Sequence, residues 1–304
     1  RECDLFYYPP FPNSQITGMI GERKNIKTYG SRDIRTLFLL FNFDPPFNDL
    51  QFRQFLFGKL AGNPDFIHGD PLFKSTRQLI PTDIVQPISE TDIDDMISEF
   101  DPKPPQEKWQ VELTMPPAAQ LTACEERLLP MFQELRGEIT FHTPTADDLF
   151  TILEDANYRM FLVSSSINSK DVTACMNYLF GPFIKKYPHM KEFQELEKML
   201  RQSEAATTKA EKMEAYRAIS RHLIKNVLVI PLAYAPFYYV THKGIDLLNL
   251  SPYDNRLQFW NIRKRPLPHH PDALELEAAE EAKAQAKAER ANLRRRILAD
   301  EPQS

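Results

Sequence analysis

Residues 41–57 read FNFDPPFNDLQFRQFLF, and this stretch constrains the fold more than any other in the sequence. An apolar run reaches Asn42 and must end at Asp44, because the double proline that follows lacks the amide donors of a central strand and disfavours helical backbone in the residue before it. Asn48 or Asp49 then supplies a side-chain oxygen that can cap a helix. The sequence therefore predicts a buried strand, a corner and a capped helix in direct succession.

The remainder of the chain alternates between extended and helical segments. The extended runs are separated by segments whose apolar residues recur at helical spacing. This alternation predicts an α/β fold with the strands around Val111, Ile139 and Phe161 in one sheet, because a helix long enough for a crossover separates each strand from the next. The predicted strands are residues 109–116, 138–144 and 158–166, and the predicted helices are residues 92–100, 121–137, 147–155 and 191–224, the last interrupted at 203–210.

Composition excludes several functional classes. The chain has 304 residues, 42% of them hydrophobic, and a formal net charge of −5, so it can bury a large core but lacks the basic excess of a general nucleic-acid binder. No glycine-rich loop of the dinucleotide or nucleoside triphosphate type occurs. Cys3, Cys124 and Cys175 are too widely spaced for a Cys-x-x-Cys metal site or a disulfide framework, and leave room for one disulfide. We predict no cofactor and no nucleic-acid partner.

Two polar clusters resemble sites, and each has a simpler interpretation. Ser164, Ser165 and Ser166 follow an apolar strand without a Gly-x-Ser-x-Gly elbow, so they indicate the polar end of a strand rather than a nucleophile. Such strand ends are where α/β sheets bind ligands. His269 and His270 have no carboxylate or thiol at metal-ligand spacing, and flanking prolines predict a loop. We predict no metal site and, because no pair of carboxylates stands out for acid–base work, no catalysis.

The C-terminal segment 266–304 differs in composition from the rest of the chain. It is rich in Ala, Glu, Lys and Arg, with acidic residues followed by basic ones at helical spacing, which predicts a helix. Acidic residues flank the Arg294–Arg296 cluster, so it indicates a solvent-facing or partner-facing helix end. The apolar stripe of this helix is too thin to hold it in a core, and we expect the helix to project or to lie along a partner. The stripe consists of Leu274, Leu276, Leu293, Ile297 and Leu298.

Three segments together resemble one family in order and spacing. Residues 37–56 read LFLLFNFDPPFNDLQFRQFL, residues 157–180 read NYRMFLVSSSINSKDVTACMNYLF, and residues 215–248 read AYRAISRHLIKNVLVIPLAYAPFYYVTHKGIDLL. They are similar to a strand, corner and helix, a central strand with the ligand-side loop after it, and a closing helix with its return strand. The family is that of the extracytoplasmic solute-binding proteins of family 5, which serve peptide, nickel and related ABC importers. The resemblance covers residues 1–262.

The resemblance implies an α/β fold that forms the C-terminal lobe of a two-lobed periplasmic-binding-protein-like fold of type II. Two strands cross between the lobes in this family, and we expect residues 38–43 and 229–234 to lie side by side as those crossings. The implied hinge residues are Asn42, Phe43, Pro231 and Leu232. The implied parts are residues 1–46, a part of the first lobe with a hinge strand; 47–230, the C-terminal lobe; 231–265, the return strand and first-lobe segment; and 266–304, the helical tail.

The resemblance also implies a function, which is to bind a peptide or other small solute for the membrane subunits of an ABC importer. The implied location of the protein is periplasmic or extracytoplasmic, either free or associated with the membrane. The implied ligand-binding residues are Ser164, Ser165, Ser166, Asn168 and Asp171. Asn168 stands where peptide-binding members commonly carry an Asp that receives the peptide's α-amino group, so this position brings an amide without a charge. An alternative is a structural or accessory subunit of a larger assembly with the tail as its contact. A separate chain is a candidate source of the remaining N-terminal lobe.

Overall fold

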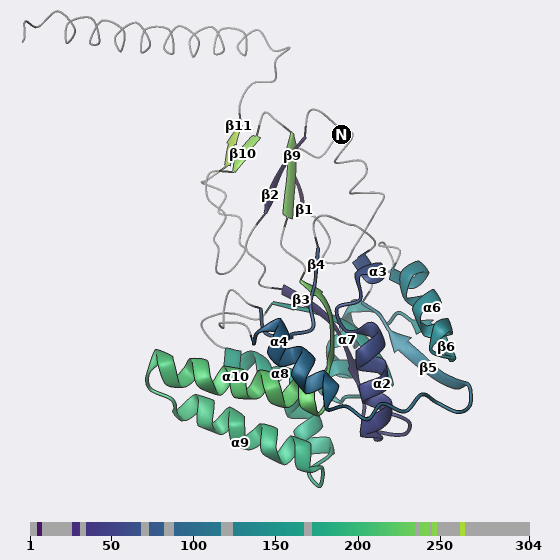
Figure 1. The fold of residues 1–304 in the computed structure, drawn as a ribbon. Helices are drawn as coiled ribbons and strands as arrows, with labels where there is room; N and C mark the ends of the chain where they lie inside the picture. The colour runs from purple at the N-terminus through teal and green to yellow at the C-terminus, as the bar shows by residue number, and fades with distance from the viewer. Residues whose placement is uncertain are drawn as a thin grey trace, which may run out of the picture.

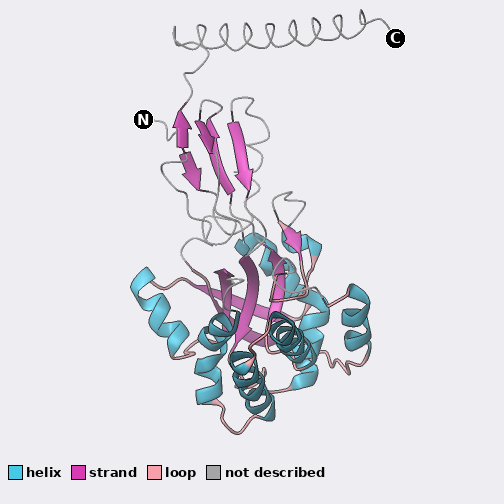
Figure 2. Ribbon diagram, turned by 90° about the vertical axis from the view of Figure 1, so that its left-hand side faces the viewer, coloured by secondary structure: helices cyan, strands magenta, loops and turns pink. Residues whose placement is uncertain are grey.

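The computed structural model shows two groups of strands, with helices gathered around the larger group (Figures 1 and 2). The structure describes residues 5–7, 26–30, 35–67, 73–81, 88–116, 124–166, 172–234, 238–242, 245–247 and 262–264. The predicted tail helix, the histidine pair, Cys3, Asn168 and Asp171 lie outside the described residues.

The larger sheet has six strands and mixed direction. Strand β3 is antiparallel to both of its neighbours, β7 and β8, whereas β5 is parallel to both β6 and β7. The predicted α/β fold is therefore confirmed, as is the prediction that the strands around Val111, Ile139 and Phe161 share one sheet. Its strands, in spatial order, are β4 (Lys74–Ser75), β8 (Ile230–Tyr234), β3 (Arg35–Phe41), β7 (Met160–Ser166), β5 (Trp109–Thr114) and β6 (Gly137–His142).

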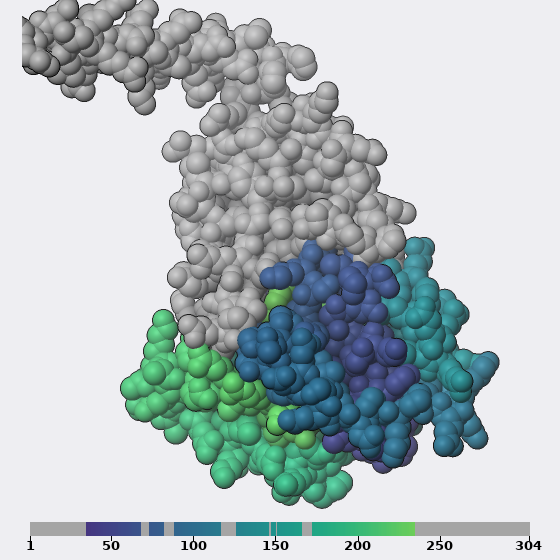
Figure 3. All heavy atoms as spheres, in the orientation of Figure 1, coloured from purple at the N-terminus to yellow at the C-terminus, as the bar shows by residue number. Residues whose placement is uncertain are grey.

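Helices lie on both sides of this sheet (Figure 2), and α4 packs beside α10 on the face shown in Figure 3. Helix α4 begins two residues before the predicted start at 92, because Ser89 and Asp92 form a capping box there. The described helices are α2 (Leu50–Leu60), α3 (Pro64–Ile67), α4 (Glu90–Ser98), α6 (Cys124–Glu134), α7 (Ala146–Glu154), α8 (Val172–Lys186), α9 (Lys191–Ala205) and α10 (Lys209–Lys225). Among the described residues, no helix has both the length and the apolar character needed to cross a membrane.

The core of the molecule is centred on β3. Residues 37–41 are fully buried, because neighbouring strands flank β3 on both sides and helices cover the sheet. This matches the continuous apolar run, which is typical of a strand covered on both faces. At the end of β3 the chain turns through a cis Pro45-Pro46 bond, and Asp49 caps α2 by accepting a hydrogen bond of 2.9 Å from the amide of Gln51. The predicted strand, corner and capped helix are all confirmed.

The turn between α6 and β6 differs from the prediction of a helix that ends at Gly137. Helix α6 stops at Glu134, and Arg136 adopts a left-handed backbone with φ of 59°. Gly137 instead begins β6. A Cβ at Gly137 would lie 2.7 Å from Cζ2 of Trp109, so glycine is required here by the close approach of the indole ring.

The smaller sheets lie above the larger one in Figure 1. Strands β1 (Leu5–Tyr7), β9 (Tyr238–His242) and β2 (Ile26–Gly30) form an antiparallel sheet in the order β1-β9-β2. Strands β10 (Ile245–Leu247) and β11 (Ile262–Lys264) form an antiparallel pair. The chain passes from β2 to β3 through residues 31–34 and from β8 to β9 through residues 235–237. The neighbouring strands β3 and β8 therefore both connect the larger sheet to the three-stranded sheet, which is called the smaller sheet below.

Candidate functional site

The polar end of β7 lies where the chain leaves the larger sheet. In the ladder between β3 and β7, Ser164 is opposite Leu37 and Ser165 is opposite Thr36. In the ladder between β3 and β8, Thr36 is opposite Tyr234, the last residue of β8. The serines, the start of β3 and the end of β8 therefore share one end of the sheet, and this is the end from which both connections to the smaller sheet depart.

Two side chains at this end are already hydrogen-bonded. The hydroxyl of Thr36, which is fully buried, donates to the carbonyl of Leu79 at 2.7 Å. The hydroxyl of Tyr234 donates to the carbonyl of Ile80 at 3.3 Å. Both bonds hold residues 79–80 against this end of the sheet. The hydroxyl hydrogens of Thr36 and Tyr234 are therefore already used within the protein.

Ser164 differs from these two residues. Its Oγ is buried and has no hydrogen-bond partner among the residues that the structure describes, whereas Ser165 is half-buried on the neighbouring position. Most buried polar groups in proteins have a partner, so an unpartnered hydroxyl marks a place where a water or a ligand group belongs. Ser166 completes β7, and Asn168 and Asp171 follow it in the chain beyond the described strand.

The expected hinge residues are divided between two places. Pro231 and Leu232 lie within β8, where Pro231 is opposite Phe38 beside an irregularity in the ladder. Asn42 and Phe43 lie at the other end of β3, next to the proline corner. The predicted adjacency of the two apolar runs is confirmed by the ladder between β3 and β8. Both are inner strands of the larger sheet, and their connections to the smaller sheet are at 31–34 and 235–237.

The proline corner is held by a hydrogen-bond network around Asp44. The side-chain amide of Asn42 donates to Oδ2 of Asp44 at 3.1 Å, and the hydroxyl of Tyr187 donates to Oδ1 at 3.3 Å. The same hydroxyl accepts from the amide of Phe43 at 3.2 Å. Burial, which outweighs the opposing bond from Phe43, raises the pKa of Tyr187 to about 12, and the charge of Asp44 acts in the same direction.

Arg53 is the largest fully buried side chain of the described core, and it joins three parts of the chain. Its guanidinium donates to the carbonyl of Phe47 at 2.8 Å and to the carbonyl of Asn226 at 3.0 Å. It also lies 3.6 Å from a carboxylate oxygen of Glu192 and 5.0 Å from the ring centroid of Phe43. Burial lowers the pKa of Arg53 to about 10, and the Glu192 charge opposes this shift in part.

Sequence reasoning did not single out Arg53 or Tyr187. Both residues form hydrogen bonds with groups that are far away in the sequence. The hydroxyl of Tyr187 accepts from the amide of Phe43, and the guanidinium of Arg53 donates to the carbonyl of Asn226. No cluster of three or more His, Cys, Asp or Glu side chains that could hold a metal ion occurs within the described part of the chain.

Comparisons with known proteins add the fold relationship. No family model matches the sequence, and no curated protein matches it. Among solved structures, NikA from Brucella suis in complex with Fe(III)-EDTA matches 87% of the chain with a TM-score of 0.68 at 13% identity. The periplasmic binding protein DppA from Helicobacter pylori in complex with the peptide STSA matches 86% with a TM-score of 0.66 at 10% identity. A dipeptide binding protein from a Pseudoalteromonas species in complex with Met-Leu matches 87% with a TM-score of 0.63 at 14% identity.

The chain has the fold of these solute-binding proteins. The resemblance seen in the three sequence segments is thus confirmed for the fold. The chain spans 54%, 58% and 52% of the lengths of the Pseudoalteromonas, Brucella and Helicobacter proteins, respectively, so it corresponds to about half of a two-lobed solute-binding protein.

Proposed function

We propose that the chain binds a peptide-like or other small solute, without catalysis, as the extracytoplasmic binding component of an ABC importer. The observation that carries this proposal is the shared end of β3, β7 and β8. There the polar residues of β7 meet the two connections to the smaller sheet, and Ser164 has hydrogen-bonding capacity that no described residue uses. Polar groups gathered at a strand's carboxyl end, between two bodies, are the usual place for a solute in an open α/β sheet.

The proposed ligand-binding residues are Ser164, Ser165, Ser166, Asn168 and Asp171. In this proposal the serine hydroxyls and the Asn168 amide hydrogen-bond the polar groups of the solute, and Asp171 supplies the negative charge. Solved proteins with this fold hold a dipeptide, the peptide STSA and an iron chelate, which supports a small polar solute as the class to test first.

Closure in this proposal is a movement of the two sheets about the paired strands β3 and β8. Pro231 and Leu232 lie in one of these strands, and Asn42 with Phe43 anchors the far end of the other. In this proposal the strands move at one end, while the corner at the other end of β3 is held in place by Arg53 and Tyr187.

Titration calorimetry with free dipeptides, tripeptides and nickel chelates tests the proposal. Replacing Asn168 by Asp adds a charge at the position where an ammonium group would bind, so affinity for free-amine ligands should rise about fivefold. The matched control is Gln202→Glu, which adds the same charge on the exposed surface of α9 and should leave affinity unchanged. Absence of solute binding across the panel would contradict the proposal.

The alternative function, an accessory subunit that binds a partner through its tail, is separated by a second measurement. Deletion of residues 272–304 should leave solute affinity intact if the chain is a binding component. A partner that co-purifies in fixed stoichiometry with the intact chain and is lost on this deletion, together with no solute binding, would instead establish the accessory role.

A further inference from the structure

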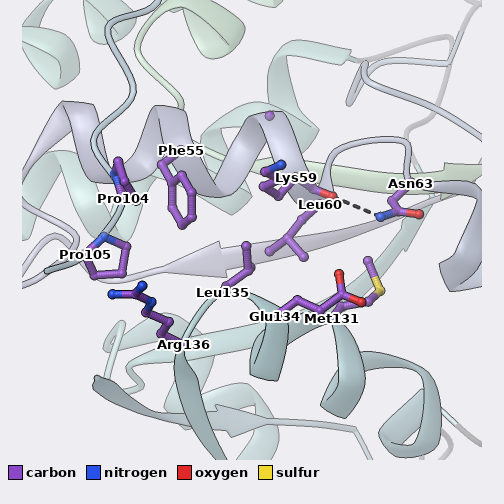
Figure 4. Close-up of a pocket in the computed structure, with 11 residues that line it drawn as sticks. Phe55, Lys59, Leu60, Asn63, Pro104, Pro105, Met131, Glu134, Leu135 and Arg136 are labelled. Atoms are coloured by element: carbon purple, nitrogen blue, oxygen red, sulfur yellow. Dashed lines mark hydrogen bonds between the residues drawn. The ribbon is translucent and has the colours of Figure 1, made fainter. Parts of the chain in front are cut away.

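A concave site lies beside the larger sheet and shares no lining residue with the proposed solute site. It is a cavity of about 630 Å³ between α2, the segment around Pro104 and Pro105, and the last turn of α6 (Figure 4). None of its lining residues belongs to β3, β7 or β8. Its volume falls within the range of small-molecule sites.

The floor of this cavity is apolar. Leu60 and Leu135 are almost fully buried beneath it, and the ring of Phe55 faces the two prolines across one side (Figure 4). An aromatic ring beside two proline rings forms a wall that suits a flat or branched apolar group. The cavity therefore favours a ligand with an apolar body.

The rim of the cavity carries three charges. Lys59 projects from α2, Glu134 from α6 and Arg136 from the turn after α6 (Figure 4). Within the described part of the chain, none of the three forms an ion pair, and the guanidinium of Arg136 makes one long hydrogen bond of 3.5 Å, to the carbonyl of Gln106. Two cations against one carboxylate leave a net charge of +1, which complements a monoanion better than a phosphate dianion.

The walls of the cavity are held in place by hydrogen bonds. The indole Nε1 of Trp109 donates to the carbonyl of Leu135 at 2.9 Å, and its backbone amide donates to the carbonyl of Arg136 at 3.2 Å. On the other side, Asn63 donates from its side-chain amide to the carbonyl of Lys59 at 3.0 Å. The backbone of Arg136 and of the residue before it is thus held by Trp109. A site that is already formed before binding loses less conformational entropy when a ligand binds.

From this arrangement we infer that the cavity binds an amphipathic monocarboxylate, with its apolar body against Phe55 and the prolines and its carboxylate at the Lys59 and Arg136 rim. The guanidinium and ammonium groups donate charge-assisted hydrogen bonds to the carboxylate. Glu134 repels a second negative charge and so selects against dianions. This site is separate from the proposed solute site and does not depend on it.

Titration of the full chain with phenylacetate and its neutral analogue phenylacetamide, followed by calorimetry and amide NMR shifts, tests the inference. Phenylacetate should bind with a millimolar or tighter Kd, and phenylacetamide about tenfold more weakly, because the charge-assisted bonds are lost. Lys59→Met and Arg136→Asn should each weaken phenylacetate binding, the Asn being chosen because it tolerates a left-handed backbone. Glu134→Gln should strengthen it.

Two further variants tie binding to this cavity. Gly58 lines it, and a Cβ there would meet nothing within 4 Å, so Gly58→Leu should fill the opening without disturbing the fold and should abolish binding. Lys212→Met, at an exposed position on α10, is the matched control and should change nothing. Equal binding of acid and amide, binding that survives Gly58→Leu, or no binding of phenylacetate at millimolar concentration would overturn the inference.

A single carboxylate beside an apolar group occurs both in small free carboxylic acids and at the C-terminus of a protein chain. Acetyl-Ala-Phe with a free carboxylate, compared with its C-terminal amide, separates these sources. A dipeptide acid that binds tenfold more tightly than phenylacetate assigns the cavity to a chain terminus, and comparable affinities assign it to free acids. Both results require that the Lys59 variant weakens binding.

Discussion

The two ends of strand β3 are built in opposite ways. At the corner end, Phe43 packs against the rings of Phe183, Tyr187 and Phe193 with centroid separations of 5.8, 5.8 and 4.8 Å, and Arg53 lies over its face. At the other end, β3 lies beside polar residues of β7, and the buried Oγ of Ser164 has no partner among the described residues. One end is filled with packed and hydrogen-bonded groups, and the other retains unused polar capacity.

This difference supports the proposal that one end of β3 binds the solute while the other end gives structural support. A solute-binding end needs donors and acceptors that folding leaves unsatisfied, which costs stability locally. The corner end offsets that cost, because its aromatic rings and the buried Arg53 network hold the end of β3, α2 and the C-terminal end of α10 together. The following substitutions measure this difference.

Phe43→Ala should have the largest effect. Phe43 is 3% exposed, and its removal leaves a cavity among four aromatic rings and beneath the Arg53 guanidinium. We expect the free energy of unfolding to fall by about 4 kcal/mol in urea denaturation. The control, Tyr178→Ala, removes a ring that is 49% exposed and should cost less than about 1 kcal/mol. Equal losses for the two variants would show that the packing of the Phe43 ring does not stabilise the corner.

Arg53→Met should follow, with a loss of about 3 kcal/mol. The substitution keeps much of the side-chain volume but leaves the carbonyls of Phe47 and Asn226 without their donor. Arg201→Met is the matched control, because Arg201 is exposed and, among the described residues, pairs with Glu197 one turn away, so that it should cost less than about 0.5 kcal/mol. A loss below about 1 kcal/mol for Arg53→Met would show that the corner is held by packing alone.

Local sequence was sufficient to predict the elements around the corner. The double proline, the Asp49 cap and the apolar run before them each act through residues within a few positions of one another, and each prediction was confirmed. The end of helix α6 was placed three residues too late, at Gly137 instead of Glu134, because the glycine is required by the remote indole of Trp109 rather than by the helix end.

The structural difference between the two ends of β3 was harder to predict from the sequence. Residues 38–43 were expected to cross between lobes, but which end of a strand faces another group of strands depends on the register of its neighbours, here Leu37 with Ser164 and with Ala233. Arg53 likewise appears as one more polar position in a helix until Asn226, 173 residues away, provides its carbonyl. Both facts arise from long-range contacts that periodicity does not report.

Thr36→Val should have a moderate effect on stability at the proposed binding end of β3. It removes the buried hydroxyl that donates to the carbonyl of Leu79 at 2.7 Å, so stability should fall by about 1 kcal/mol. Thermal unfolding of this variant beside Thr36→Ser, which retains the donor, separates the hydrogen bond from the packing of the methyl group. If the valine variant is as stable as the wild type, residues 79–80 are not held by this bond.

Tyr187 should give a pH-dependent effect at the corner. Because its folded-state pKa is raised from 10.0 to about 12, the neutral hydroxyl contributes stability that is fully present below pH 10 and is lost as the pH rises toward 12. The stability difference between the wild type and Tyr187→Phe should therefore narrow over that range. Arg53, whose pKa is lowered, acts in the opposite direction in both proteins and cancels in the difference. A difference that stays constant up to pH 12 would contradict a protonated hydroxyl at the corner.

Ser164→Ala should have the smallest effect on stability and is the sharpest test of the comparison. Because the buried Oγ has no described partner, removing it breaks no hydrogen bond, and stability should stay within about 0.5 kcal/mol of the wild type or rise slightly. Solute affinity should nevertheless fall about fivefold if the hydroxyl is held in reserve for a ligand. Chemical denaturation and calorimetry on the same preparation separate the two quantities. A clear loss of stability would show that folding already uses this hydroxyl, and unchanged affinity for a solute that the wild type binds would remove Ser164 from the site, leaving the two ends of β3 different in packing but not in function.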